Sequence, residues 1–343
     1  MVRLSPAPTT AVDEGGATTI SAVHPDVLLT HILSRLDGPT LASASCASSQ
    51  LLNLSTQENL WSDICHSTWH STLDPRMRHL ISNFPNGPRS FFSDSFPLLS
   101  SNPTPSQKSP HPPPSPPPEI ISAVDLHYKN KLIFSKVQET QTLTNWFSCS
   151  PFRIDLLDPK DVIPTSIPHT KNICQDLAEN LTLSWIIVDP MGHRAANFSS
   201  WRPVSVQRHW LSGEIQVRFA TILGGAGQTD NTTELVQCGI LVAFGGCEDG
   251  DMIVREVSLQ VEDMDGINLN GKDSLEILQV GIERGERKKG KSREERKDKY
   301  EKYLKMKTER EEMKLRRERR LDSMCIAFGL SVLTLFSMFV LYR

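Results

Sequence analysis

The residue types that most often perform chemistry are sparse in this sequence, and one small group of them lies close together. Cys65 and His66 are adjacent, and His70 and His79 follow on the same stretch of chain. Thiolate and imidazole groups are zinc ligands, but this spacing matches no standard zinc pattern. We therefore expect a helical surface here and no metal site.

Two further motifs fail on their spacing. The run Gly224–Gly227 lacks the Lys-Ser/Thr pair of a phosphate-binding loop, so it predicts a hairpin turn. Asp263-x-Asp265-Gly266 resembles a calcium loop, but its glycine is at position four and Ser274 occupies position twelve, where glutamate is required. No Ser/His/Asp or Cys/His group has a recognisable frame. We expect no catalytic, cofactor-binding or metal-binding residues, although residues far apart in sequence could still converge in the fold.

Composition and charge point to several distinct parts. The 343 residues carry 37 Lys+Arg and 40 Asp+Glu, a near balance that argues against a specific nucleic-acid binder. Residues 284–320 nevertheless hold 18 Lys/Arg against 9 Asp/Glu. Seven cysteines without a C-x-x-C pair suggest reduced thiols in the cytosol. Residues 1–22 lack the apolar core of a signal peptide and are predicted to be a disordered tail.

A small helical domain is predicted over residues 23–68. Pro25 suits a first helical position, and the apolar residues from Leu28 to Leu36 recur at helical spacing. A second helix is expected around 41–47. Ser55-x-x-Glu58 suggests a capping box for a third helix that carries Leu60 and Trp61. Periodicity alone would favour an ordinary helical hairpin with a leucine-rich core.

The run HPDVLLTHILSRLDGPTLASASCASSQLLNLSTQENLW closely resembles an F-box. His24 stands where that motif has leucine, and Asp26 stands near its usual glutamate. The resemblance implies docking on a SKP-family adaptor and, through it, on a cullin. The residues that match the motif, and that we expect to bind the adaptor, are Pro25, Leu28, Leu29, Ile32, Leu33, Leu36, Leu60 and Trp61.

Residues 69–96 are predicted to form a helical extension, and residues 97–118 a linker. Asp74-Pro75 can begin a helix, and Phe91, Phe92 and Phe96 are expected to pack the extension onto the F-box. Ten of the 23 prolines lie between Pro97 and Pro118. Such a segment favours an extended polyproline spacer, with a role as an SH3-type ligand as the alternative.

Residues 119–283 contain short β-type runs. Ile215, Val217 and Phe219 alternate with polar residues, as expected for a half-buried antiparallel strand. About eight such runs predict a mainly antiparallel, sandwich-like β domain that binds a substrate or partner. Whether it would bind protein or carbohydrate stays open, since a distant similarity to phloem-lectin-type sandwiches carries no matching sugar site. The expected strand runs are 123–128, 131–137, 146–157, 181–189, 203–207, 214–222, 234–244 and 255–261.

The C-terminal part reads as a charged helix at 284–321 followed by a transmembrane segment at 322–343. The charged helix is expected to be solvated, with i,i+4 pairs such as Glu312–Arg316. Met324–Tyr342 is 19 residues without a charge, about 28 Å of helix, close to the thickness of a bilayer core. The basic residues before it favour a cytosolic body. The four sequons, at Asn53, Asn180, Asn197 and Asn231, should then be unmodified.

The layout of these parts resembles that of a group of plant F-box proteins with a short helical extension and a C-terminal membrane segment. The chain would be a substrate receptor of an SCF-type cullin-RING ubiquitin ligase, with a protein substrate still to be identified and no catalysis of its own. A single C-terminal transmembrane helix would anchor it at the endoplasmic reticulum or connected membranes. The rival interpretation is a tail-anchored lectin-like or scaffold protein without a ubiquitin-ligase role. A membrane-tethered enzyme is a third possibility that no motif supports.

Overall fold

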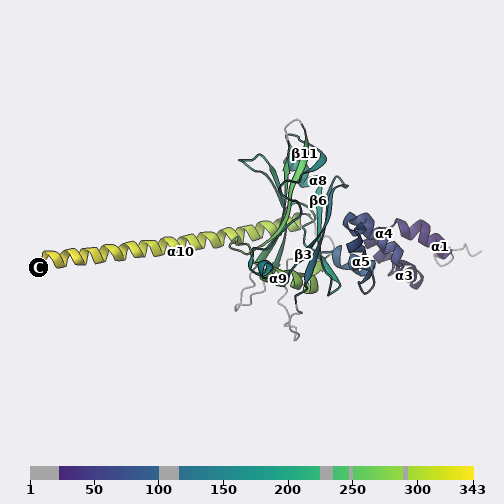
Figure 1. Cartoon of the computed structure of the whole chain (residues 1–343), viewed down its shortest axis with the longest axis horizontal. Helices are drawn as coiled ribbons and strands as arrows, with labels where there is room; N and C mark the ends of the chain where they lie inside the picture. Colours follow the sequence, from purple (N-terminus) through teal and green to yellow (C-terminus); the bar gives the residue numbers. More distant parts are fainter. Residues whose placement is uncertain (1–22, 100–115, 225–234, 247–249, 289–292) are drawn as a thin grey trace, which may run out of the picture. The chain divides into compact units, whose positions relative to one another are not determined.

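A computed structural model describes residues 23–99, 116–224, 235–246, 250–288 and 293–343 (Figure 1). The predicted disordered tail, most of the proline-rich linker and the predicted turn at residues 225–227 lie outside these residues. The chain divides into two compact units, one up to Ile64 and one from Cys65 onward. Each unit is described by itself.

The first unit is helical, as the sequence predicts, but its first helix is irregular. The Thr30 hydroxyl donates to the Asp26 carbonyl at 2.6 Å, and the Ser34 hydroxyl donates to the Thr30 carbonyl at 2.6 Å. Such back-bonding competes with the regular ladder, which accounts for the π-turn and 3₁₀ turn found here. The helical segments of this unit are α1 (Pro25–Val27), η2 (Leu28–Ile32), η3 (Leu33–Arg35), α2 (Gly38–Ala44), α3 (Ser49–Ser55) and the start of α4 (Glu58–Thr68).

Two details of the helical prediction are wrong. Ser55 is not the cap of α4, because it is the last residue of α3 and its hydroxyl donates to the Leu52 carbonyl at 2.9 Å. Helix α3 itself was not expected, because its sequence is rich in serine. Its signal is Ser48, whose hydroxyl accepts a hydrogen bond from the Leu51 N–H at 3.2 Å and so satisfies one of the free donors at the helix start.

The second unit contains a two-sheet β sandwich, which confirms the predicted fold class. One sheet has the order β12-β1-β7-β6-β2-β3, and the other has the order β4-β11-β10-β9-β8, with β5 also paired to β11. All pairs are antiparallel except β1 with β7. The first sheet is built from β1 (Leu98–Leu99), β2 (Glu119–Tyr128), β3 (Lys131–Gln141), β6 (Leu181–Asp189), β7 (Arg194–Asn197) and β12 (Arg287–Lys288). The second is built from β4 (Arg153–Asp155), β5 (Ile163–Pro168), β8 (Ser205–Arg208), β9 (Ile215–Gly224), β10 (Leu235–Gly245) and β11 (Asp251–Glu262).

The sandwich core follows the predicted alternation of strand residues. Ile215, Val217 and Phe219 of β9 are buried in this core, while Arg218 between them is exposed. The predicted helix after residue 270 is α9 (Gly271–Arg284), which lies at one end of the strands in Figure 1 and contributes to the same core, as does α8 (Ile173–Asn180). The predicted strand 146–157 is wrong in its first half, where α7 (Asn145–Cys149) forms and the Thr144 hydroxyl caps it.

The helical extension covers the outer face of the first sheet. It comprises η4 (His70–Leu73), α5 (Pro75–Ser82) and α6 (Pro88–Ser95). The Trp69 indole N–H donates to the Ser184 hydroxyl of β6 at 3.1 Å, and the Phe91 and Phe92 rings lie 5.7 and 5.4 Å from that of Trp69. Because both faces of the sheet are covered, all nine residues of β6 are buried. The packing of these phenylalanines onto the F-box stays a prediction.

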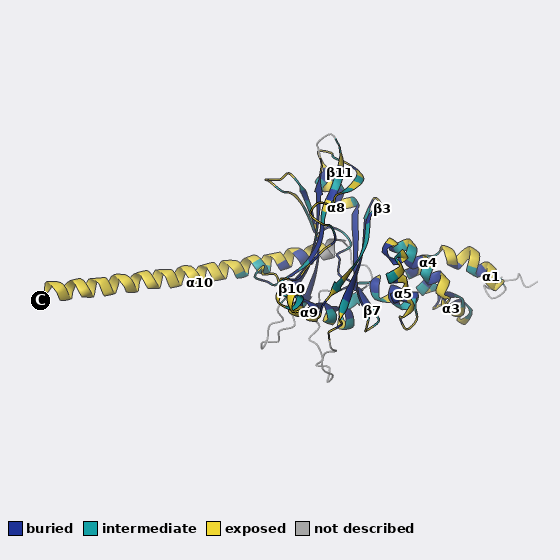
Figure 2. Cartoon of the chain, viewed as in Figure 1, coloured by how far each residue is buried: buried dark blue, intermediate teal, exposed yellow. Residues whose placement is uncertain are grey.

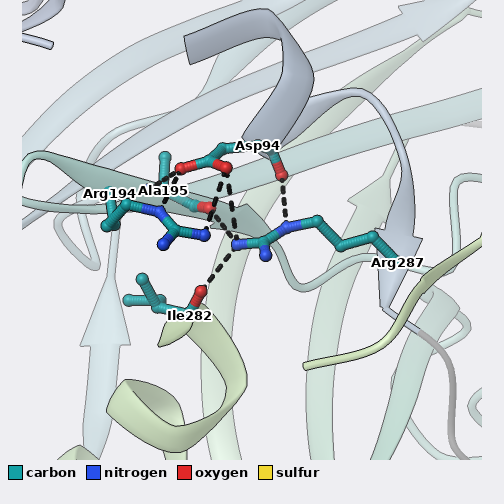
Figure 3. Close-up of polar contacts among 5 residues, drawn as sticks. All are labelled: Asp94, Arg194, Ala195, Ile282 and Arg287. Atoms are coloured by element: carbon teal, nitrogen blue, oxygen red, sulfur yellow. Dashed lines mark hydrogen bonds and ion pairs between the residues drawn. The ribbon is translucent and has the colours of Figure 1, made fainter. Parts of the chain in front are cut away.

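Asp94 of α6 joins this extension to the sandwich (Figure 3). Its carboxylate accepts from the Arg194 Nε at 2.7 Å and from the Ala195 N–H at 3.3 Å. Arg287 donates to the carbonyls of Asp94, Ala195 and Ile282 at 3.2, 3.0 and 2.6 Å, and its Nη2 lies 3.8 Å from the Asp94 carboxylate. Burial lowers the pKa of Arg287, which the nearby Asp94 charge opposes. The cluster therefore fixes α6, β7, α9 and β12 to one another.

We expect Asp94→Ala to destabilise the second unit by about 3 kcal/mol, since it leaves the largely buried Arg287 without its carboxylate. Arg194, which is 40% exposed, loses the same partner but remains solvated. Asp155→Ala is a matched control. The Asp155 and Arg153 side chains are 48% and 43% exposed, whereas those of Asp94 and Arg287 are 14% and 16% exposed. Loss of such an exposed pair costs less than about 1 kcal/mol. Chemical unfolding of the detergent-solubilised chain measures both, and equal effects would contradict a structural role for the cluster.

Candidate functional site

The predicted adaptor-binding residues divide into exposed and buried groups. Ile32 is 46% exposed, whereas its neighbour Leu33 is 1% exposed, so the two side chains face opposite sides of the first helical segment. Pro25 is exposed and Leu29 and Leu36 are half-buried. The remaining predicted residues belong to the core of the unit: Leu28, Leu60 and Trp61.

We name the accessible residues Val27, Leu29, Ile32 and Leu36 the N-terminal apolar surface. Val27 was not among the predicted residues, although it is 44% exposed. The sequence offered one signal for its exposure, which is that Val27 directly precedes Leu28, the first buried leucine. Burial of such side chains against a partner contributes about 25 cal/mol per Å² of apolar area, so four such residues within a ten-residue stretch suit a protein contact.

The buried group holds this surface in place. The Trp61 indole N–H donates to the Ser55 carbonyl at 2.6 Å, which connects α4 to the end of α3. Leu28 and Leu33 are buried from the same segment that exposes Ile32. Substitution of a buried residue would therefore change the fold of the unit, whereas substitution of Ile32 would change its surface.

The residues that resemble a zinc site have other roles. Cys65 is buried, and burial raises the pKa of its thiol to about 12, so the thiol stays protonated at neutral pH. Its Sγ lies 3.5 Å from the Pro88 carbonyl, to which it donates. Within the part of the chain that the structure describes, no three His, Cys, Asp or Glu side chains are grouped to hold a metal ion.

The aspartates that resemble a calcium loop form a turn instead. Asp263 Oδ1 accepts from the N–H groups of Asp265 and Ile267 at 2.8 and 2.9 Å, and Gly266 has a φ of 76°, which favours glycine. The Asp265 carboxylate lies 2.9 Å from Arg310 Nε and 2.7 Å from Lys314 Nζ. Cationic side chains of the C-terminal helix thus occupy this turn.

This C-terminal helix, α10 (Arg293–Leu341), packs against the second sheet. Tyr300 and Tyr303 are buried in a cluster with Ala220 and Ile222, which face outward from β9, and with Met264. The prediction of a solvated charged helix is therefore wrong for the part of α10 that contains the two tyrosines. Because they are buried, the two tyrosines are also inaccessible for stacking on nucleic-acid bases.

Beyond this docked portion, α10 is exposed (Figure 2). The expected pair of Glu312 and Arg316 forms at 2.9 Å. From Met324 to Leu341 the helix is apolar and exposed throughout. Among the described residues α10 is the one helix long and apolar enough to cross a membrane.

We expect Asp265→Ala to loosen α10 from the sandwich, because it removes the shared partner of Arg310 and Lys314. The hydrogen bond from Lys314, with the charge of Arg310, lowers the pKa of Asp265. A lowered pKa means that the contribution to docking is present at neutral pH and is lost as the pH falls through that lowered value. Trypsin should cleave α10 near residues 305–314 faster in this variant. Glu312→Ala, which removes an exposed pair on the same helix, should leave cleavage unchanged, and equal rates in the two variants would contradict the docking role.

Comparisons with known proteins agree with this arrangement. The family description "F-box domain" matches residues 24–63, which contain the N-terminal apolar surface. A probable F-box protein of Arabidopsis thaliana is 47% identical over 328 residues, covering 94% of each chain. Two further F-box proteins of that plant are each 42% identical, covering 97% and 94% of this chain and 99% and 90% of their own lengths. No solved structure matches at a significant level.

Proposed function

The chain belongs to the F-box protein family of plants, the substrate adaptors of SCF-type ubiquitin ligases, and we propose that it is a membrane-anchored member that recruits its target through the β domain. F-box proteins are in general non-catalytic and bind a SKP1-type adaptor and, through it, a cullin. We propose the same division of labour for this chain, with ubiquitin transfer performed by other subunits.

The observation that carries the proposal is the exposure of the N-terminal apolar surface within the matched F-box. Val27, Leu29, Ile32 and Leu36 are exposed or half-buried within ten residues of the matched F-box, and apolar residues that are exposed as a group are typical of interaction sites. In this proposal Leu29, Ile32 and Leu36 contact the adaptor directly. Leu28, Leu33, Leu60 and Trp61 contribute by fixing the helices that present them.

The β domain is the proposed substrate-binding part. It belongs to a second compact unit with its own sandwich core, so it can present a surface that does not depend on the F-box. The Asp94 cluster and the docked portion of α10 make this unit rigid from the helical extension to the C-terminal helix. A rigid receptor domain loses less entropy on binding than a mobile one.

Membrane attachment is proposed for the apolar end of α10. Met324, where the uncharged stretch starts, is ten positions after Lys314, which contacts the sandwich. In a continuous helix this interval spans about 15 Å. Arg316, Arg317, Arg319 and Arg320 lie within this interval, where anionic head groups would attract them and keep the body cytosolic.

Co-purification tests the proposal as a whole. The full-length chain, extracted with detergent from plant membranes, should retain a SKP-family adaptor and a cullin, and the complex should support ubiquitin transfer when supplied with the other ligase components. A chain recovered from membranes without the adaptor would contradict the ligase role. A chain recovered with the adaptor from the soluble fraction alone would contradict the anchor.

A further inference from the structure

One strand at the edge of the sandwich differs from all the other described edge strands. β3 is the last strand of its sheet and pairs with β2 alone. It is 11 residues long and contains no proline. The other edge strands of the described part of the chain, β4, β8 and β12, have three, four and two residues, and the six-residue β5 contains two prolines. Proteins commonly protect sheet edges by such shortening and by proline, and β3 has neither. Its lysines, Lys131 and Lys136, and its register shift lie at or before the middle of the strand, so the remainder of this long edge is open to another strand.

The backbone of this edge has unpaired hydrogen-bonding groups. In an antiparallel pair, alternate N–H and C=O groups of an edge strand point away from the neighbouring strand. The pairing of β3 with β2 is regular from Phe134 to Gln141, and the register shift lies before it, near Ile133. Among the described residues, no backbone hydrogen bond joins residues 132–140 to any strand other than β2.

A cleft of about 620 Å³ runs along the edge. Its walls include all the residues from Leu132 to Val137, although adjacent residues of a strand point to opposite faces of the sheet. Phe134 lies in the sandwich core, whereas Ser135 donates to Asp125 on the other face at 2.7 Å. Because consecutive residues of β3 line it, the cleft includes the backbone of this strand, which has no neighbouring strand other than β2.

The opposite wall of the cleft is rigid. It is formed by η4, with His70, Ser71 and Leu73 among the lining residues. The Ser71 N–H and hydroxyl donate to the buried Asp125 carboxylate at 2.9 and 2.5 Å, which holds this turn against β2. Leu73 is exposed at the rim. Leu73, with Leu132 and Val137, gives the cleft apolar contacts for the side chains of a bound segment.

We propose that this cleft binds an extended peptide segment of the substrate, which adds to the first sheet as a strand beside β3. The inference rests on the proposed substrate-receptor function and names its binding site. The occupant follows from the chemistry of the edge, since a row of unpaired N–H and C=O groups is complementary to another extended backbone. Such binding derives its affinity from main-chain hydrogen bonds and its specificity from alternate side chains, here those that meet the apolar wall.

The test uses the detergent-solubilised full chain in complex with its adaptor, and a displayed library of random peptides of about twelve residues, the length of a long strand. Selected peptides should slow hydrogen exchange at residues 134–140. N-methylation of the peptide backbone should weaken binding at every second residue, by about tenfold at each sensitive site. The proposal would be overturned if the peptides slowed hydrogen exchange elsewhere on the chain, or if N-methylation did not weaken binding at every second residue. It would also be overturned if the library gave no binders.

Two matched variants test the location. Leu73→Arg places a charged side chain at the rim of the cleft and should weaken peptide binding by about tenfold or more. Leu143→Arg changes another exposed leucine of the same unit, outside the cleft, and should leave binding unchanged. Equal effects of the two would overturn the site.

Two further measurements separate the alternatives. Light scattering detects a second copy of the chain as the occupant, and a dimer that Leu73→Arg dissociates would overturn the peptide proposal. Both variants should keep the adaptor bound. If the chain binds the adaptor but no peptide, this inference alone is refuted. If the chain binds peptides but not the adaptor, the ligase function alone is refuted.

Discussion

Ile32→Asp should reduce the affinity of the chain for its adaptor by about a hundredfold or more. In the free chain the side chain is 46% exposed, so the aspartate is solvated and the unit should stay folded. In the complex the carboxylate would be buried without a partner, at a cost of several kcal/mol. Since about 2.8 kcal/mol corresponds to a hundredfold change in the dissociation constant, the loss should be large. Titration calorimetry with purified adaptor measures it.

The neighbouring residue provides the contrast. Leu33 is 1% exposed, so Leu33→Asp should unfold the helical unit and abolish binding indirectly. A double change at both positions would therefore not distinguish loss of contact from loss of fold. Circular dichroism and protease resistance should be normal for Ile32→Asp and abnormal for Leu33→Asp. Leu143→Asp controls for an added surface charge, and a folded Ile32→Asp variant that binds normally would contradict adaptor docking through this surface.

The sequence pattern predicted the helical unit better than it predicted which residues face outward. Leu28, Leu29, Ile32, Leu33 and Leu36 all fit one apolar stripe of a regular helix. This stripe is wider than the stripe of a helix that only faces a core, and the helix changes from π to 3₁₀ geometry within it. Some of these residues are therefore buried and others are exposed. Periodicity does not reveal a local change of helical pitch that hydroxyl back-bonding produces.

In the β domain, all the long strands were predicted: a predicted run falls on each of β2, β3, β6, β9, β10 and β11. Among the short strands, β4 and β8 coincide with predicted runs, whereas β1, β5, β7 and β12 do not. β1 and β12 have two residues each, too few for any periodic signal, and they pair because distant parts of the chain converge. The contacts of Asp94 also gave no local signal, because its partners Arg194 and Arg287 are 100 and 193 residues away in the sequence.

The docking of α10 did have a signal in the sequence. Tyr300, Tyr303, Lys307, Arg310 and Lys314 recur at alternating spacings of three and four, which place them on one face of a helix. Each contacts the sandwich or its turn, the tyrosines by burial and the cations through carboxylates. Because three of the five are charged, a search for apolar periodicity alone misses the stripe. Long cationic side chains can serve on a docking face when acidic partners meet them.

Val332→Arg combined with Leu335→Arg should release the chain from membranes. Both residues lie in the uncharged, exposed part of α10. In a bilayer each arginine costs about 2.5–3.5 kcal/mol near the helix centre, so the pair costs about 5–7 kcal/mol. That should exceed the insertion preference of a stretch that Gly329, Ser331 and Thr334 already weaken. The variant should move from the carbonate-resistant pellet to the soluble fraction while it still binds the adaptor.

The control for that change places the same two charges outside the apolar stretch. Met313→Arg with Leu315→Arg alters exposed residues of the charged part of α10, so this variant should stay in the pellet. The topology follows from the same helix, because the arginines before it favour a cytosolic body. Asn197 is buried and its amide oxygen accepts from the N–H groups of Trp185 and Ser199, whereas Asn53 is exposed and would accept a glycan in the lumen. The anchor as proposed would be contradicted by a glycan at Asn53, or by a Val332→Arg/Leu335→Arg variant that stays in the carbonate-resistant pellet. A lumenal body would also separate the F-box from the cytosolic adaptor, on which the ligase function depends.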